Sequence, residues 1–123
     1  MTLSVLMRMN RRRAAFMATP NKDSNIAATL ERLRKELGAD AFDIIDHWNS
    51  DRAAVGIASP RNHQVLVYIS TAYDDGFYAE LEIPPAPGGN SIYQVAGRYS
   101  GLTYNQLVDI VTEHLAVRVV ERN

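Results

Sequence analysis

Residues 77–83, "FYAELEI", decide the fold of this chain. Apolar side chains stand at every second position, namely Phe77, Ala79, Leu81 and Ile83. The positions between them are polar and carry Tyr78, Glu80 and Glu82. Strict alternation of this kind predicts a β-strand with one face in the core and the other in water. We therefore expect the polar face of this strand to be acidic and wet.

The segments before this strand predict further strands. Residues 64–70, "QVLVYIS", form a continuous apolar run rich in β-branched side chains, which is typical of a central strand covered on both faces. Turn residues at 49–51 separate two short apolar segments, which predicts a hairpin with strands near 42–48 and 53–58. The first of these stays ambiguous, because its large apolar side chains also fit one face of a helix.

Two amphipathic helices flank the strands. Apolar side chains recur at Ile26, Leu30, Leu33 and Leu37, which predicts a helix over 24–37. Asp23 or Ser24 can cap its start, and Gly38 can end it in a left-handed conformation. After a further strand over 92–100, Thr103 and Gln106 form the pattern of a capping box that opens a last helix. Its expected buried stripe is Leu107, Val108, Val111 and Leu115.

This order predicts an α+β fold. About five short strands form a mostly antiparallel sheet, and one N-terminal and one C-terminal helix pack on one face of it. The other face is left for solvent or for a partner, and function is expected there.

The length and charge of the chain suit one soluble domain. At 123 residues it is long enough for a single core. Residues 1–22 carry five basic and no acidic side chains, which leaves 8 basic and 14 acidic residues beyond them. We expect residues 1–22 to be a disordered basic extension and residues 23–123 to be the domain; a transit peptide and an arm docked on the acidic body or on a second subunit are the alternatives.

Composition argues against several function classes. An acidic body disfavours nucleic-acid binding, and no apolar run is long enough to span a membrane. The chain has no cysteine, no glycine-rich phosphate loop and none of the common hydrolase or metalloprotease motifs. We therefore expect no catalytic residues, no metal and no cofactor.

The acidic residues of 74–82 indicate a docking surface. Glu80 and Glu82 share one strand face, and the turn residues Asp74 and Asp75 can extend the same negative patch. Tyr78 adds an aromatic ring, with Tyr73, Tyr93 and Tyr99 close by in the sequence. We predict that Asp74, Asp75, Tyr78, Glu80 and Glu82 bind a basic protein. The alternatives are a solvated strand face, a hard-cation site and a carboxylate pair for acid and base catalysis.

Two patterns, "W-x-x-D-x-x-A-V-G-I-A" from residue 48 and "L-V-Y-I-S-T" from residue 66, carry a resemblance. Over residues 24–117 the chain resembles the small α+β immunity proteins of bacterial polymorphic toxin and contact-dependent growth inhibition systems. The resemblance implies a small, cytoplasmic, cofactor-free protein whose acidic surface blocks a basic toxin domain. Alternatives are a secretion-chaperone-like homodimer that holds an effector segment, and a small carboxylate-dependent enzyme.

Overall fold

One antiparallel sheet organises the molecule. The computed structural model describes residues 22–45 and 50–117. The strands are β1 Asp43–Ile44, β2 Ala54–Ser59, β3 Asn62–Ser70, β4 Phe77–Ile83 and β5 Gln94–Leu102. Their order in the sheet is their order in the chain, and every neighbouring pair is antiparallel. The predicted meander is confirmed, and β3 is its central strand.

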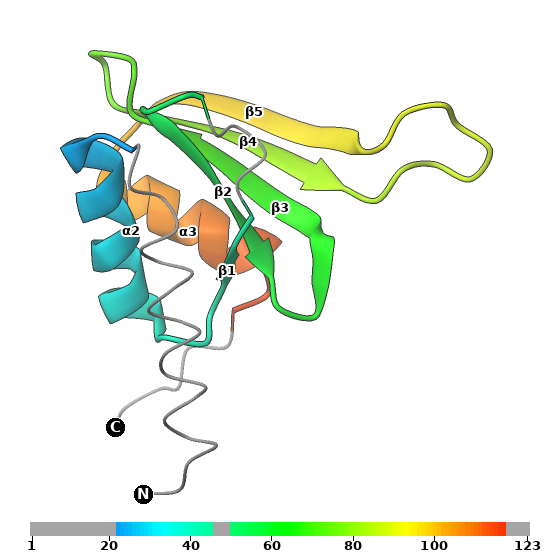
Figure 1. Cartoon of the computed structure of the whole chain (residues 1–123), viewed down its shortest axis with the longest axis horizontal. Coiled ribbons are helices and arrows are strands. Elements are labelled where there is room, and N and C mark those ends of the chain that lie inside the picture. The colour runs from blue at the N-terminus through cyan, green and yellow to red at the C-terminus, as the bar shows by residue number, and fades with distance from the viewer. Residues whose placement is uncertain (1–21, 46–49, 118–123) are drawn as a thin grey trace, which may run out of the picture.

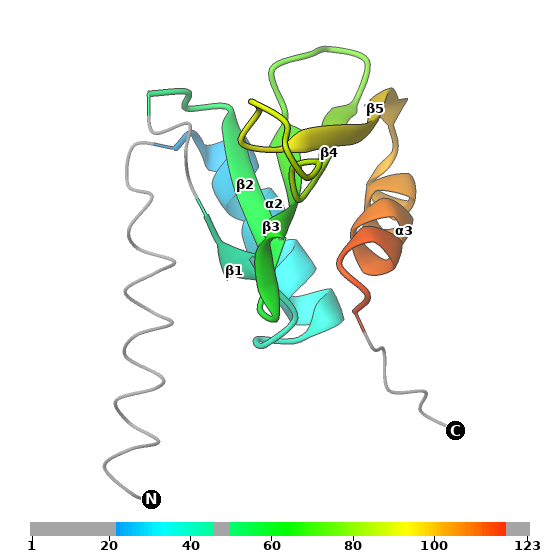
Figure 2. The same ribbon diagram turned by 90° about the vertical axis from the view of Figure 1, so that its right-hand side faces the viewer.

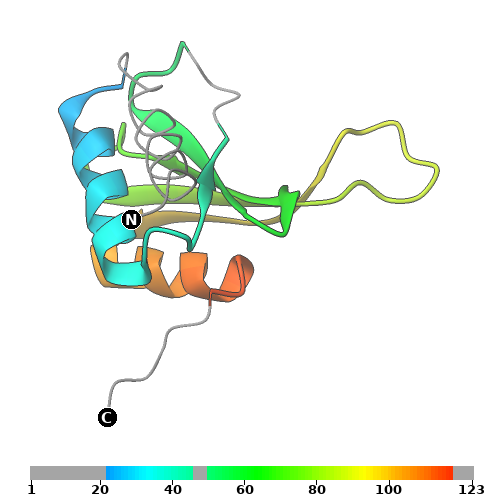
Figure 3. The ribbon, with the colours of Figure 1, turned by 60° about the horizontal axis from the view of Figure 1, so that its bottom comes forward.

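Both described helices, α2 Ser24–Leu37 and α3 Tyr104–His114, lie on the same side of the sheet (Figures 1 and 3). Asp23 caps α2 by accepting a hydrogen bond from the amide of Ile26 at 2.9 Å. The capping box of α3 is confirmed, with Thr103 and Gln106 bonding each other's backbone amides at 3.2 and 2.9 Å. The α+β prediction holds with both helix starts as expected.

The core lies between the sheet and the two helices. Its buried side chains come from both helices, from β2 to β5 and from the residue before β1, and the cluster includes Ile26, Leu30, Leu33, Phe42, Val55, Ile57, Val67, Ile69, Ala79, Leu102, Leu107 and Val111. The predicted stripes of both helices are confirmed, although Leu37 and Val108 are only partly buried. The two-residue period of the strands therefore sends one half of their side chains into this core.

Three details differ from the sequence prediction. The strand expected at 42–48 has only two described strand residues, Asp43 and Ile44, and residues 46–49 lie outside the described part. The last strand begins and ends two residues later than expected, at Gln94 and Leu102. Gly38 has a positive φ of 107° but an extended ψ of 154°, so it is not left-handed helical.

The connection between β4 and β5 projects far beyond the helices (Figure 1), and in Figure 2 it points towards the viewer. Its prolines cannot donate ladder hydrogen bonds, which ends the strand pairing after Ile83. Ile92, in this connection, is 83% exposed. The loop thus presents apolar surface at a distance from the core.

Candidate partner-binding site

The sheet face opposite α2 and α3, here called the far face, is built from three rows of paired residues. Register places Ala58, Leu66, Glu82 and Val95 in one row, Gly56, Tyr68, Glu80 and Arg98 in the next, and Ala54, Ser70 and Tyr78 in the third. Each row crosses consecutive strands from β2 towards β5. The far face therefore changes from small and apolar on β2 to aromatic and charged on β3 and β4.

A hollow of about 350 Å³ lies on the aromatic part of the far face. Its lining consists of four tyrosines and two glutamates: Tyr68, Tyr73, Tyr78, Tyr93, Glu80 and Glu82. The ring of Tyr78 meets that of Tyr68 edge-on at 6.1 Å and that of Tyr73 at 5.7 Å between centroids. These rings support one another, so the walls are held in place before any partner arrives. We call these six residues the tyrosine–glutamate hollow.

Glu80 is the carboxylate at the centre of the hollow. Its Oε2 accepts a hydrogen bond from the hydroxyl of Tyr78 at 3.0 Å and lies 3.4 Å from Nε of Arg98 on β5. The Arg98 side chain remains 63% exposed, so water competes with Glu80 for its guanidinium group and weakens the ion pair. The pair shows that the Glu80 carboxylate can bind a guanidinium group.

Glu82 corrects the prediction of a wet strand face. The residue is only 7% exposed, although alternation places it on the far face as expected. It stands between Leu66 and Val95 in its row, so its nearest cross-strand neighbours are apolar. Alternation therefore gives the direction of a side chain correctly but does not give its accessibility.

The hydroxyls of Tyr68 and Tyr78 are neutral hydrogen-bonding groups. Burial, together with the carboxylate of Asp51 at 3.4 Å, raises the pKa of Tyr68 from 10 to about 12. Burial and the hydrogen bond to Glu80 also raise the pKa of Tyr78. Both hydroxyls stay protonated at neutral pH and can donate hydrogen bonds, while the two glutamates supply acceptors.

Three of the five predicted partner-binding residues lie together in the structure, and two lie elsewhere. Tyr78, Glu80 and Glu82 come together in the hollow, whereas Asp74 and Asp75 are exposed in the turn before β4. Asp74 lines a different cavity on the helix side, and the carboxylate of Asp75 lies near Gly101 of β5. The turn acids therefore do not line the hollow with Glu80 and Glu82.

Sequence reasoning missed Tyr68 as a member of the hollow. It stands in an apolar run that hides the alternation of faces, and only its pairing with Glu80 in the neighbouring strand reveals its direction. Tyr73 and Tyr93, near the acids in sequence, do line the hollow. Tyr99 does not, because it pairs with Ala79 and therefore points to the helix side.

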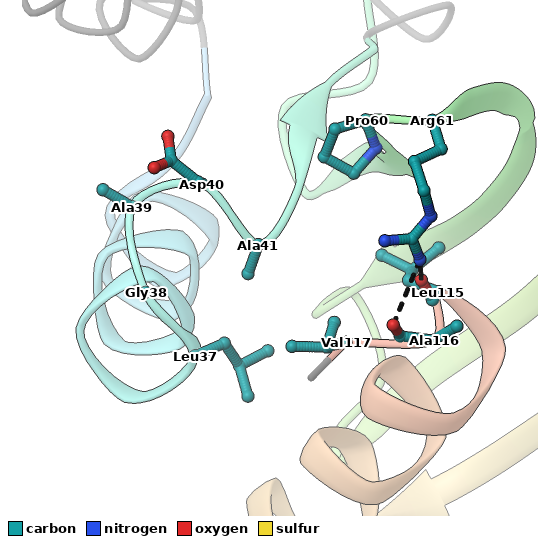
Figure 4. Close-up of a pocket in the computed structure, with 10 residues that line it drawn as sticks. All are labelled: Leu37, Gly38, Ala39, Asp40, Ala41, Pro60, Arg61, Leu115, Ala116 and Val117. Atoms are coloured by element: carbon teal, nitrogen blue, oxygen red, sulfur yellow. Dashed lines mark hydrogen bonds between the residues drawn. The ribbon is translucent and has the colours of Figure 1, made fainter. Parts of the chain in front are cut away.

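Among the cavities on the helix side, two border α2. Figure 4 shows the first, of about 360 Å³, where the ends of α2 and α3 meet the β2–β3 turn. Nη2 of Arg61 donates to the carbonyls of Leu115 and Ala116 at 3.2 and 3.1 Å, so this guanidinium caps the end of α3. Its role is structural.

The second helix-side cavity, of about 350 Å³, lies between α2, the β3–β4 turn and Tyr104. The guanidinium of Arg32 stacks 3.6 Å from the centroid of the Tyr104 ring, and the Tyr104 hydroxyl donates to Glu36 at 2.7 Å. Burial and this hydrogen bond raise the pKa of Tyr104. The three side chains join α2 to the start of α3, so their contacts serve the packing of the helices.

Within residues 22–45 and 50–117, no three histidine, aspartate or glutamate side chains gather as a metal site, and no helix is long and apolar enough to cross a membrane. No protein-family model matches the chain, and no curated protein or solved structure is significantly similar to it.

Proposed function

We propose that this protein is a cytoplasmic immunity protein that binds a basic toxin domain through the tyrosine–glutamate hollow. The observation that carries the proposal is the gathering of four tyrosines around two glutamates in one hollow of the far face. We propose a toxin as the partner because residues 24–117 resemble immunity proteins. In this function the protein binds a partner and catalyses no reaction.

The hollow has the chemistry of a receptor for a lysine or arginine side chain. Tyrosine rings attract a cation over their faces, and a carboxylate strengthens the contact by charge-assisted hydrogen bonds. The Arg98 side chain is 63% exposed, so a partner's guanidinium can compete with it for Glu80, whose own side chain is 19% exposed. Apolar surface at Ile92 and Val95 lies beside the hollow and can complete the interface.

The test compares partner binding by the parent chain with that by two variants. Glu80→Lys reverses the central charge, and Tyr73→Ala removes a ring that is 56% exposed, so neither change removes a fully buried side chain. Glu82 is left intact because it is buried. The candidate partners are the toxin-like products, if there are any, of the genes that adjoin this one, and association is followed at two salt concentrations.

We expect each variant to weaken binding at least about tenfold, and we expect binding by the parent chain to weaken as salt rises. Asp109→Lys, at an exposed position of α3, is the matched charge control and should bind like the parent. Parent-like binding and protection from the toxin by both hollow variants would exclude the hollow as the contact surface.

A further inference from the structure

The cavity between α2, the β3–β4 turn and Tyr104 has the size of a small-molecule site. Its volume of about 350 Å³ falls within the usual range for such sites, about 300–1,000 Å³. Part of its lining comes from α2, and the rest comes from the β3–β4 connection and from the starts of β4 and α3. In Figure 1 these segments meet at the left of the molecule. We call this space the Arg32 cavity, because Arg32 is the only basic residue in its described lining.

The guanidinium group of Arg32 is held by an aromatic ring. It stacks 3.6 Å from the centroid of the Tyr104 ring, and the hydroxyl of Tyr104 is fixed in turn by donating to Glu36 at 2.7 Å. Within residues 22–45 and 50–117, no ion pair or side-chain hydrogen bond involves Arg32. A stacked guanidinium carries its N–H groups at its edge, so these donors remain available to a ligand in the cavity.

Two aromatic side chains form an apolar corner of the Arg32 cavity. Phe77 and Tyr104 both line it, with ring centroids 6.4 Å apart and ring planes at 61° to each other. Such a corner suits the packing of a third ring, either edge-on or stacked. Asp74 is the only acid in the described lining, and its charge disfavours a ligand that carries more than one negative charge.

We propose that the Arg32 cavity binds a small aromatic monocarboxylate. The carboxylate pairs with the edge of the Arg32 guanidinium, whose planar fork can donate two parallel hydrogen bonds to it. The aromatic ring of the ligand packs against Phe77 and Tyr104. Because stacking on Tyr104 already orders Arg32, little side-chain freedom is lost on binding. This site is distinct from the tyrosine–glutamate hollow, although Tyr73 lines both.

Three probes separate the contribution of the charge from that of the ring. Phenylacetate carries both, phenethyl alcohol carries the ring without the charge, and acetate carries the charge without the ring. Each is titrated into the isotope-labelled full chain, and its Kd is measured from the amide signals of Gly76 and Phe77, with Asp109 on α3 as the remote reference. We expect phenylacetate to bind at least about tenfold more tightly than either other probe. Equal binding of phenylacetate and either other probe would overturn the proposal, as would unchanged signals at Gly76 and Phe77.

Two variants test the cavity itself. Arg32→Gln removes the guanidinium, whereas Ala28→Trp fills the cavity from an exposed position of α2 and leaves Arg32 in place. Lys35→Gln is the matched control, since it removes an exposed charge from the same helix outside the cavity. We expect each cavity variant to weaken phenylacetate binding at least about tenfold, and the control to bind like the parent.

Thermal unfolding shows whether each variant is folded. Ala28→Trp removes no polar contact, so it keeps the test decisive if Arg32→Gln fails to fold. Parent-like binding of phenylacetate by a folded Arg32→Gln or Ala28→Trp chain would overturn the proposal. Neither experiment uses a protein partner or changes a residue of the hollow, so both results are independent of the proposed function.

Discussion

At the residue scale, the turn before β4 depends on a glycine. Gly76 has φ +132°, and a Cβ atom placed there would lie 2.5 Å from the backbone carbonyl oxygen of Leu102. The backbone of β5 cannot move away without losing its pairing with β4, where Phe77 faces Leu102. Absence of a side chain at this position therefore lets the first pair of the β4–β5 ladder form.

We expect Gly76→Ala to destabilise the fold by about 2–3 kcal/mol, because it combines an unfavourable φ with a backbone clash. Chemical denaturation measures the change. Gly88→Ala is the matched control: its φ of +76° is also positive, but no atom lies within 4 Å of the added Cβ. If both variants lose the same stability, the clash with Leu102 contributes nothing.

At the element scale, the sequence predicted which segments form helices and strands better than it predicted the site. Periodicity gave both helices, because apolar stripes at three- and four-residue spacings have no other regular fit. Strict alternation fixed the faces of β4, and Tyr78, Glu80 and Glu82 are indeed together. The role of Tyr68 and the separation of Asp74 from Glu80 could not be predicted, because both depend on the pairing and twist of neighbouring strands.

The end of α3 yields a prediction at this scale. Ala116 has a left-handed φ of 53°, and the amide of Val117 bonds back to the carbonyl of Thr112 at 2.9 Å, as in a glycine-terminated helix. We expect Ala116→Gly to raise the free energy of unfolding by about 0.5–1 kcal/mol, since glycine adopts this conformation without steric cost. Urea midpoints check the change against Ala72→Gly, at an exposed loop position that should lose stability. A variant no more stable than the parent would contradict the prediction.

At the scale of the whole molecule, the sheet separates two environments. The helix side holds the apolar core, and the far face holds the tyrosine–glutamate hollow. Three tyrosines with raised pKa values, Tyr68, Tyr78 and Tyr104, lie on both sides of the sheet. Because folding raises all three pKa values, the free energy of unfolding falls at high pH.

Between pH 10 and about 12 the unfolded chain releases the proton of Tyr68 while the folded chain keeps it, so the free energy of unfolding falls as pH rises. The stabilisation from this group is complete below pH 10 and is lost as pH approaches about 12. We expect Tyr68→Phe to lose stability less steeply than the parent across this range, as measured by denaturation at several pH values. Tyr99→Phe, an exposed tyrosine of β5, is the control and should follow the parent. If the free energy of unfolding of Tyr68→Phe falls with pH as steeply as that of the parent, Tyr68 is not the group responsible.

The two-residue alternation of β4 also bears on how such a gene can change over generations. Codons 77, 79 and 81 are constrained by the core cluster, whereas codons 78 and 80 encode far-face side chains that lie outside it. Mutations at the second set can change the proposed contact surface while selection on the first set preserves the fold. If the proposed function holds, lineages of this protein can diverge in specificity by changing alternate codons of a single strand.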